Sequence, residues 1–523
     1  MAVGVQRFLP VHETAKLSRR SKWLIGAGLL LAGVGAAAIV LAGRLGPALR
    51  GSVVEAIARR FASDVELKSL DVSMFPMRAS GQGLILRQHG RTDVPPLISI
   101  DRFSVDGGLL GLITTPKRVR KVRLDGLRII IPKGRPSPQQ DRSEGHKSST
   151  AAFLIEEIVA DGAVLQILPK DEGKDPLTFD LYKLTLRNAG KGRPMSYRAS
   201  LKNAKPPGMI ETTGEFGPWQ SDEPSETPVS GNYTFRNADL SVFKGISGKL
   251  SSDGKFRGQL GHIEADGFTD TPDFALDISS HSVHLKNQFH AIIDGGDGDT
   301  LLQPVDGQFL NSTVQARGGV TGTPQVKGKT VDLDATVSKS RLEDMLQLAM
   351  KSDRPFMKGD VNVRTKIVIP PGDRDVVDKL ILKGAFDVSS AKFLKVSIQD
   401  KVDTLSRRGK GETDDTESEG DVASNLKGTF QLKNGVMEFS KLSFRVPGAL
   451  IQLHGTYGLR TEAIDFHGTA QTDAKLSEMT TGFKSFLLRA GDPFFKKNKS
   501  GAVIPIKITG TRSQPAFGLE LRK

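Results

Sequence analysis

The 523-residue chain contains no cysteine. That absence excludes disulfide scaffolds, thiol catalysis, iron–sulfur clusters and cysteine-ligated zinc sites. Aromatic residues are also scarce, at 6% of the chain. Apolar residues still make up 38% and recur from end to end, which excludes a wholly disordered chain. The 56 glycines and the short apolar alternations favour a long β protein, and 73 basic against 59 acidic residues make it basic.

The sequence also lacks the motifs of common catalytic and metal sites. It has no Gly-x-Ser-x-Gly motif for a serine nucleophile. Gly322–Thr330 has five residues, not four, before its Gly-Lys pair, so it does not predict a phosphate loop. Asp294–Asp299 resembles a calcium loop, but Val305 stands where the twelfth-position glutamate belongs. We therefore predict a non-enzyme without catalytic residues, metal or cofactor; an enzyme with unrecognised distant carboxylates is a less favoured alternative.

One long apolar run stands near the N-terminus. Residues 23–43 carry no charge, and 21 helical residues span about 31 Å, enough to cross a hydrocarbon core of about 30 Å. The alternative is a cleaved signal peptide, but Val40-Leu41-Ala42 is a poor cleavage site. Five basic residues against one acidic precede the run, and four against three follow it in 44–66. The bias predicts a single-pass anchor with a cytoplasmic N-terminus and the bulk of the chain beyond the membrane.

An amphipathic helix is expected directly after this run. Leu49, Val53, Ile57 and Phe61 recur at every fourth position, as on one face of a helix. Packing against the first strands is one interpretation of this face, and lying along the lipid surface is the other.

From residue 65 onward, apolar and polar residues alternate with a period of two. This pattern predicts strands with one apolar and one wet face, which is typical of antiparallel sheets. Three segments give the candidate lining of an apolar face: Val331, Leu333, Ala335 and Val337; Val361, Val363, Ile367 and Ile369; Ile504, Ile506 and Ile508. Helical periodicity interrupts the strands only at Arg341–Met350 and Lys475–Leu488.

A short pattern occurs twice. Leu124–Lys133 reappears about 36 residues later, slightly loosened, as Ala160–Lys170, each copy placing a strand between Asp-Gly and Pro-Lys. The echo fits a stacked β array. Three segments break the array: a polar linker at Pro136–Thr150, a proline-rich irregular crossing at Lys205–Pro228, and an acidic mobile loop at Arg407–Asp421.

A basic cluster lies early in the array. Its members are Lys117, Arg118, Arg120, Lys121 and Arg123. Interleaved aromatic residues for base stacking are missing, so we expect no nucleic-acid partner. A solvated strand face is one interpretation; contact with anionic headgroups at the membrane surface is the other.

Three stretches of the chain resemble the AsmA-like family. They are Ala58–Pro132, with PLISIDRFSVDGGLLGLITTPKRVRKVRLDGLRIIIP; Ser340–Gly409; and Gly428–Lys523, with GTFQLKNGVMEF and IPIKITGT. The resemblance implies a bacterial inner-membrane protein with a periplasmic β-groove, akin to bridge-like lipid transfer proteins and linked with phospholipid transport and outer-membrane biogenesis. The chain is much shorter than the longest bridge-like members, and its proline-rich and acidic segments interrupt the array.

The predicted fold is mainly β: an N-terminal transmembrane helix, then an elongated, curled antiparallel β-sheet groove with a few short amphipathic helices. The expected segments are a cytoplasmic N-terminus (1–22), the transmembrane helix (23–43), an N-terminal AsmA-like β region (44–135), the polar linker (136–150), a middle β array (151–338), a helix plus β region (339–406), the acidic mobile loop (407–422) and a C-terminal AsmA-like β region (423–523).

Two functions remain in view. The first is to hold phospholipid acyl chains in the groove, with the inner membrane as the second partner; the scarcity of aromatics favours an aliphatic lining. The alternative is a non-enzymatic scaffold or assembly factor, with outer-membrane or periplasmic proteins as partners and strands closed into sandwiches. Alternation alone does not separate the two, because a sandwich core and a lipid groove have the same pattern.

Overall fold

The computed structural model describes residues 63–74, 77–88, 95–106, 117–131, 153–169, 176–190, 193–203, 205–218, 224–279, 281–351, 354–394, 396–410, 422, 424–473 and 502–520. The predicted membrane segment 23–43, the amphipathic helix after it, the linker 136–150 and the predicted helix Lys475–Leu488 lie outside these residues. Within the described ranges, no helix is both long and apolar enough to span a membrane.

The described chain is mainly β, as predicted. Its first strands are β1 Ser63–Met74, β2 Met77–Gln88, β3 Ile98–Asp106, β4 Lys117–Asp125, β5 Arg128–Ile131, β6 Phe153–Ile167, β7 Leu177–Gly190, β8 Met195–Asn203, β9 Gly208–Phe216, β10 Pro228–Asp239, β11 Ile246–Ser247 and β12 Lys249–Gln259. The later strands are β13 His262–Leu276, β14 Val283–Ile293, β15 Thr300–Phe309, β16 Ser312–Gly322, β17 Lys329–Arg341, β18 Met357–Ile369, β19 Ile381–Phe393, β20 Ser424–Lys433, β21 Val436–Val446, β22 Ala449–Gly458, β23 Ala463–Thr472, β24 Ala502–Thr511 and β25 Pro515–Leu519. The helices are η1 Pro224–Glu226, η2 Leu240–Val242, α4 Leu342–Ala349, α5 Val376–Lys379 and α6 Val396–Lys410.

The chain divides into two compact units. Unit 1 comprises residues 1–165, 183–198 and 214–229, and unit 2 comprises residues 166–182, 199–213 and 230–523. Each unit has its own core.

In unit 1 the sheet is mixed, so the expectation of a wholly antiparallel sheet was wrong. β1, β2 and β3 pair antiparallel in chain order, but β4 pairs with β6 in parallel. The register sets Leu124 opposite Ala160 and Asp125 opposite Asp161, so the two copies of the sequence echo lie side by side. Both Asp-Gly steps place their glycine at positive φ, 66° and 69°. Alternation reports which face a residue occupies but not the direction of its neighbouring strand, which is why the parallel pair was missed.

The apolar face of unit 1 is shielded from solvent. Leu84, Val105, Val119, Val122 and Ile155 are each 0% exposed. This face is therefore a packed core.

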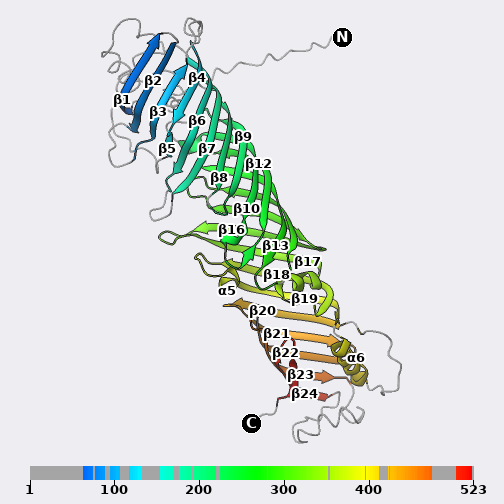
Figure 1. The fold of residues 1–523 in the computed structure, drawn as a ribbon. Helices are drawn as coiled ribbons and strands as arrows, with labels where there is room; N and C mark the ends of the chain where they lie inside the picture. Colours follow the sequence, from blue (N-terminus) through cyan, green and yellow to red (C-terminus); the bar gives the residue numbers. More distant parts are fainter. Residues whose placement is uncertain are drawn as a thin grey trace, which may run out of the picture. The chain divides into compact units, whose positions relative to one another are not determined.

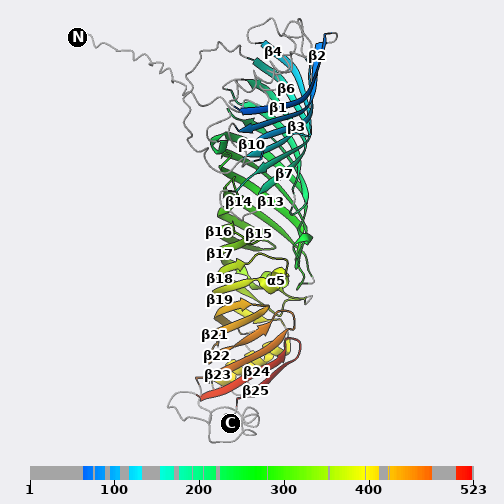
Figure 2. The ribbon, with the colours of Figure 1, turned by 90° about the vertical axis from the view of Figure 1, so that its left-hand side faces the viewer.

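In unit 2 the strands form an antiparallel meander. From β12 to β25, each strand pairs with the next one along the chain. Figure 1 shows β16–β24 following one another in chain order, and Figure 2 shows the same for β14–β19. Register shifts interrupt several of these pairings, for example between Val337 and Ser340 and between Val388 and Ala391. Such bulges bend the strands and curl the sheet.

Connections of unit 2 agree with the sequence in part. The helix predicted over Arg341–Met350 is confirmed as α4. The helix α6 was missed, and it runs to Lys410, so the expected acidic loop is helical over its first four residues. The region Lys205–Pro228 was also wrongly read as irregular, because it contains β9. Its prolines flank that strand instead of interrupting it.

A buried carboxylate fixes α4 to the meander. Asp344 is 4% exposed and accepts hydrogen bonds from Asn311 N (2.9 Å) and Ser312 Oγ (2.8 Å) in the β15–β16 turn. Asp344→Ala would leave both donors without this acceptor, so we expect the free energy of unfolding to fall by about 2–4 kcal/mol. Chemical denaturation checks this. Asp306→Ala, which removes an exposed carboxylate that accepts a hydrogen bond from Gln315, is the matched control and should change stability by under about 1 kcal/mol.

Candidate functional site

The predicted lining residues of β17 and β18 lie on one face as direct cross-strand neighbours. Val331 lies opposite Ile369, Leu333 opposite Ile367, and Val337 opposite Val363. Ala335, in the same register, lies opposite Thr365, and Val361 lies opposite Val388 of β19.

The β24 candidates lie on the same face, further along the meander. Successive cross-strand partners from β17 to β25 are Val337, Val363, Phe386, Gly428, Leu442, Leu453, Gly468, Ile506 and Leu519. Ile504 and Ile508 flank Ile506, opposite Ala470 and Phe466. We call this continuous surface of β17–β25 the apolar face. The opposite face carries charges such as the Lys366–Asp332 ion pair (2.6 Å).

Exposure varies along the strands of the apolar face. At one end of the strands Val361 is 2% exposed, and Ala335, Val337 and Ile504 are also buried. The other candidates remain partly exposed: Val331, Leu333, Val363, Ile367, Ile369, Ile506 and Ile508. Helices account for much of the burial, because α4 packs near Val361 and α6 packs on Phe444 and Ala449. The face is therefore covered at the end of the strands that carries α4 and α6, and its middle is an accessible apolar surface.

Phenylalanine rings form part of this surface, which the sequence analysis missed in expecting an aliphatic lining. The ring centroid of Phe386 lies 6.1 Å from that of Phe430 and 6.3 Å from that of Phe439, and Phe439 lies 5.7 Å from Phe466. Glycines make room for these rings: a Cβ at Gly428 would lie 2.7 Å from Phe386 Cε1. Glycines within alternating strands are a sequence signal for such close approach.

The basic cluster is partly neutralised. Lys121 Nζ lies 2.8 Å from Glu157, which also pairs with Arg187 at 3.3 Å. The hydrogen bond from Lys121 lowers the pKa of Glu157. Arg118, Arg120 and Arg123 are exposed on β4, and the side chain of Lys117 lies outside the described residues. Of the four cluster side chains that the structure describes, the three arginines are therefore the ones exposed to an anionic partner.

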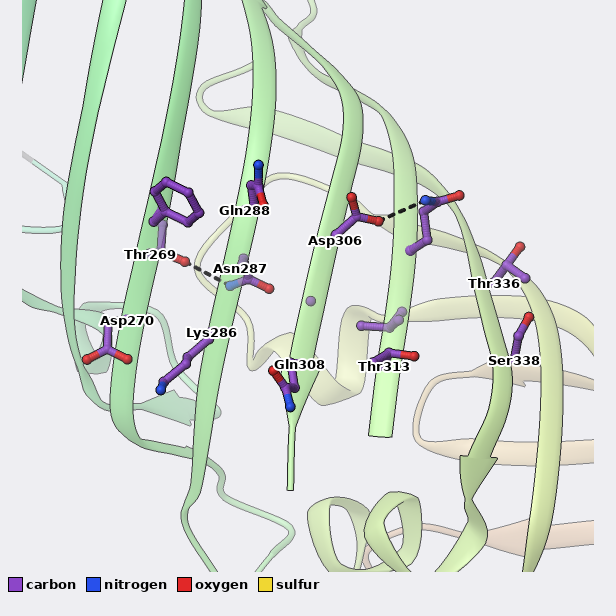
Figure 3. A pocket seen from close by; sticks show the side chains of 14 residues that line it. Thr269, Asp270, Lys286, Asn287, Gln288, Asp306, Gln308, Thr313, Thr336 and Ser338 are labelled. Atoms are coloured by element: carbon purple, nitrogen blue, oxygen red, sulfur yellow. Dashed lines mark hydrogen bonds between the residues drawn. The ribbon is translucent and has the colours of Figure 1, made fainter. Parts of the chain in front are cut away.

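A polar depression of about 670 Å³ spans β13–β17 (Figure 3). Phe268 in its lining is 61% exposed. Its carboxylates are engaged, Asp270 by His284 Nε2 (2.5 Å) and Asp306 by Gln315 Nε2 (2.8 Å). The depression thus offers amide, hydroxyl and lysine groups beside two hydrogen-bonded carboxylates.

The calcium-like segment is a lysine-filled turn. Lys329 Nζ donates to Asp297 O (2.9 Å) and Asp299 Oδ1 (3.0 Å), so an ammonium group occupies the centre of the loop. Among the residues with described positions, no group of three or more His, Asp and Glu side chains could hold a metal ion.

Comparison with known proteins gave no match, whether to a protein-family model, to a curated protein or to a solved structure. The site must be interpreted from its own geometry.

Proposed function

We propose that the protein holds phospholipid acyl chains on the apolar face of unit 2, for transfer from the inner membrane toward the outer membrane. The observation that supports this best is the continuity of the apolar face over β17–β25 together with its partly exposed middle. The proposed location, with a single N-terminal anchor and unit 2 in the periplasm, rests on the resemblance to the AsmA-like family and on the charge bias around residues 23–43.

The energetics favour a lipid as the occupant. An acyl chain in water costs about 0.8 kcal/mol per CH₂, so on the order of 10 kcal/mol per chain. Nine strands spaced at about 4.8 Å give a face about 40 Å long, compared with about 15 Å for one leaflet of a hydrocarbon core. The apolar face is thus long enough to take a whole acyl chain out of water.

The scaffold alternative differs in what would cover the apolar face. A scaffold or assembly factor for outer-membrane proteins would bury Val363 and Ile367 under a protein partner. The apolar side chains of unit 1 are already packed in a core, so we assign lipid to unit 2 only. We also propose that Arg118, Arg120 and Arg123 contact anionic headgroups, to which each basic residue contributes about 1 kcal/mol near a membrane surface.

Photo-crosslinking in the intact chain tests the lipid proposal. A benzophenone amino acid at Val363, on the apolar face, is expected to capture phospholipid in bacterial membranes, as detected by mass spectrometry of the adduct. The same group at Val368, on the opposite face of the same strand, is the matched control and should capture none. Protein adducts at Val363 without lipid would support the scaffold instead, and equal capture at both positions would contradict a specific groove.

A further inference from the structure

Two connections from opposite ends of β18 approach each other. α4 joins β17 to β18, and α5 joins β18 to β19, so the two helices belong to opposite margins of the apolar face. A straight strand of the 13 residues in β18 would separate these margins by about 40 Å.

One short segment, Asp277–Ser279, contacts both margins. Ser279 Oγ donates to Gln347 O of α4 at 2.9 Å. Two residues earlier, Asp277 Oδ2 lies 3.2 Å from Arg460, which in turn contacts Asp378 of α5 at 2.9 Å. Because Cα atoms two residues apart are separated by at most about 7 Å, the margins must come close together here.

The segment is tied to its neighbours through the backbone as well. Asp277 N donates to Gly245 O at 3.0 Å, and Val376 N of α5 donates to Lys244 O at 2.8 Å. We call Lys244–Gly245 together with Asp277–Ser279 the bridge. Ile278 in its centre is 4% exposed and Val377 beside it is 2% exposed, so the bridge is packed in place.

Val363 and Ile367 of β18 and Phe386 of β19 nevertheless stay partly exposed. The bridge packs against both margins, but these apolar side chains of β18 and β19 between the margins remain accessible. The two margins are thus joined beside strands whose apolar side chains stay partly exposed.

Arg460 holds the bridge closed. Its guanidinium, from the β22–β23 turn, contacts three carboxylates: Asp277 (3.2 Å), Asp375 (2.9 Å) and Asp378 (2.9 Å). Burial and the adjacent Asp375 raise the pKa of Asp277. Without the cation, Asp277 and Asp375 would repel each other across the bridge.

We propose that the bridge turns the apolar face at β18–β19 into a tunnel through which acyl chains pass lengthwise, and that Arg460 is the positioning residue that prevents their sideways release. The inference rests on the proposed lipid function. According to this proposal, acyl chains move lengthwise past β18–β19. The bridge determines whether they continue lengthwise or leave sideways.

The test compares Arg460→Gln with Arg512→Gln. Arg512 lies in the β24–β25 turn, on the same margin as Arg460. It pairs with Glu462 (3.0 Å) and not with a residue of the bridge. The intact chain is reconstituted in vesicles of phosphatidylethanolamine and phosphatidylglycerol, and the loss of a fluorescent phospholipid to acceptor vesicles is followed. Hydrogen exchange at the amides of Asp277 and Val376 reports whether the bridge opens.

Arg460→Gln is expected to speed both lipid release and amide exchange on the order of tenfold, with unchanged lipid capture at Val363, whereas Arg512→Gln should match the wild type. Faster amide exchange with an unchanged release rate would overturn the tunnel while leaving lipid binding in place. Unchanged amide exchange would overturn the role of Arg460. Absence of lipid from all three proteins would overturn the proposed function and the tunnel together.

Discussion

Under the proposed lipid function, replacing Val363 with aspartate is expected to remove at least about nine-tenths of the phospholipid bound by the purified protein. Val363 lies in the partly exposed middle of the apolar face, between Val337 and Phe386. A carboxylate there would lose its hydration whenever an acyl chain lay over it, at a cost of several kcal/mol. Lipid extraction followed by mass spectrometry gives the number of phospholipids per chain.

Val368→Asp is the matched control for this experiment. It makes the same change five residues along β18, on the charged face, where its cross-strand neighbour is Asp332. The control should retain its lipid and the same content of β structure by circular dichroism. If folded Val363→Asp protein kept its full complement of phospholipid, the apolar face could not be where the acyl chains lie.

Gly455→Ala is expected to lower the free energy of unfolding by about 3–5 kcal/mol. Gly455 has φ of +154°, and a Cβ placed on it would lie 2.1 Å from Asp465 O of the neighbouring strand. In the register it stands between Phe439 and Phe466, whose rings meet across it at 5.7 Å. The substitution therefore adds backbone strain and a clash that only separation of β22 from β23 can relieve.

Gly372→Ala separates these two effects. Gly372 also has positive φ, at +103°, but a Cβ there would meet no atom within 4 Å. Its cost should be limited to strain, about 1–3 kcal/mol, in the same chemical denaturation measurement. Equal losses for the two variants would mean that the close approach of strands at Gly455 contributes little.

The alternating pattern predicted much of unit 2 correctly. It placed the lining residues of β17, β18 and β24 on strands, and the register puts them on one face because the period of two is fixed by strand geometry. Helical spacing likewise predicted α4. The echo between Leu124–Lys133 and Ala160–Lys170 marked two segments that are neighbours in space, although it did not reveal that they run parallel.

Features that depend on distant residues could not be read from local patterns. Arg460 and Asp277 are 183 positions apart, and neither lies in a segment whose composition marks it. α6 was missed for another reason: in its described side chains the buried apolar contact is made by little more than Val402 and Leu405, too few for a clear helical stripe. The phenylalanines of the apolar face were discounted because aromatic residues are rare overall, whereas their positions opposite glycines decide their role.

The neighbour-to-neighbour pairing of unit 2 has a consequence for how the chain is made. Since each strand from β13 to β25 bonds to the strand just before it, every ladder can close as soon as the next strand has emerged, without waiting for more distant sequence. A chain whose residues emerge in order from the N-terminus could thus extend this sheet one strand at a time, with a single exposed edge moving toward the C-terminus. The bridge is completed later, because Arg460, which pairs with Asp277, follows β22 in the chain.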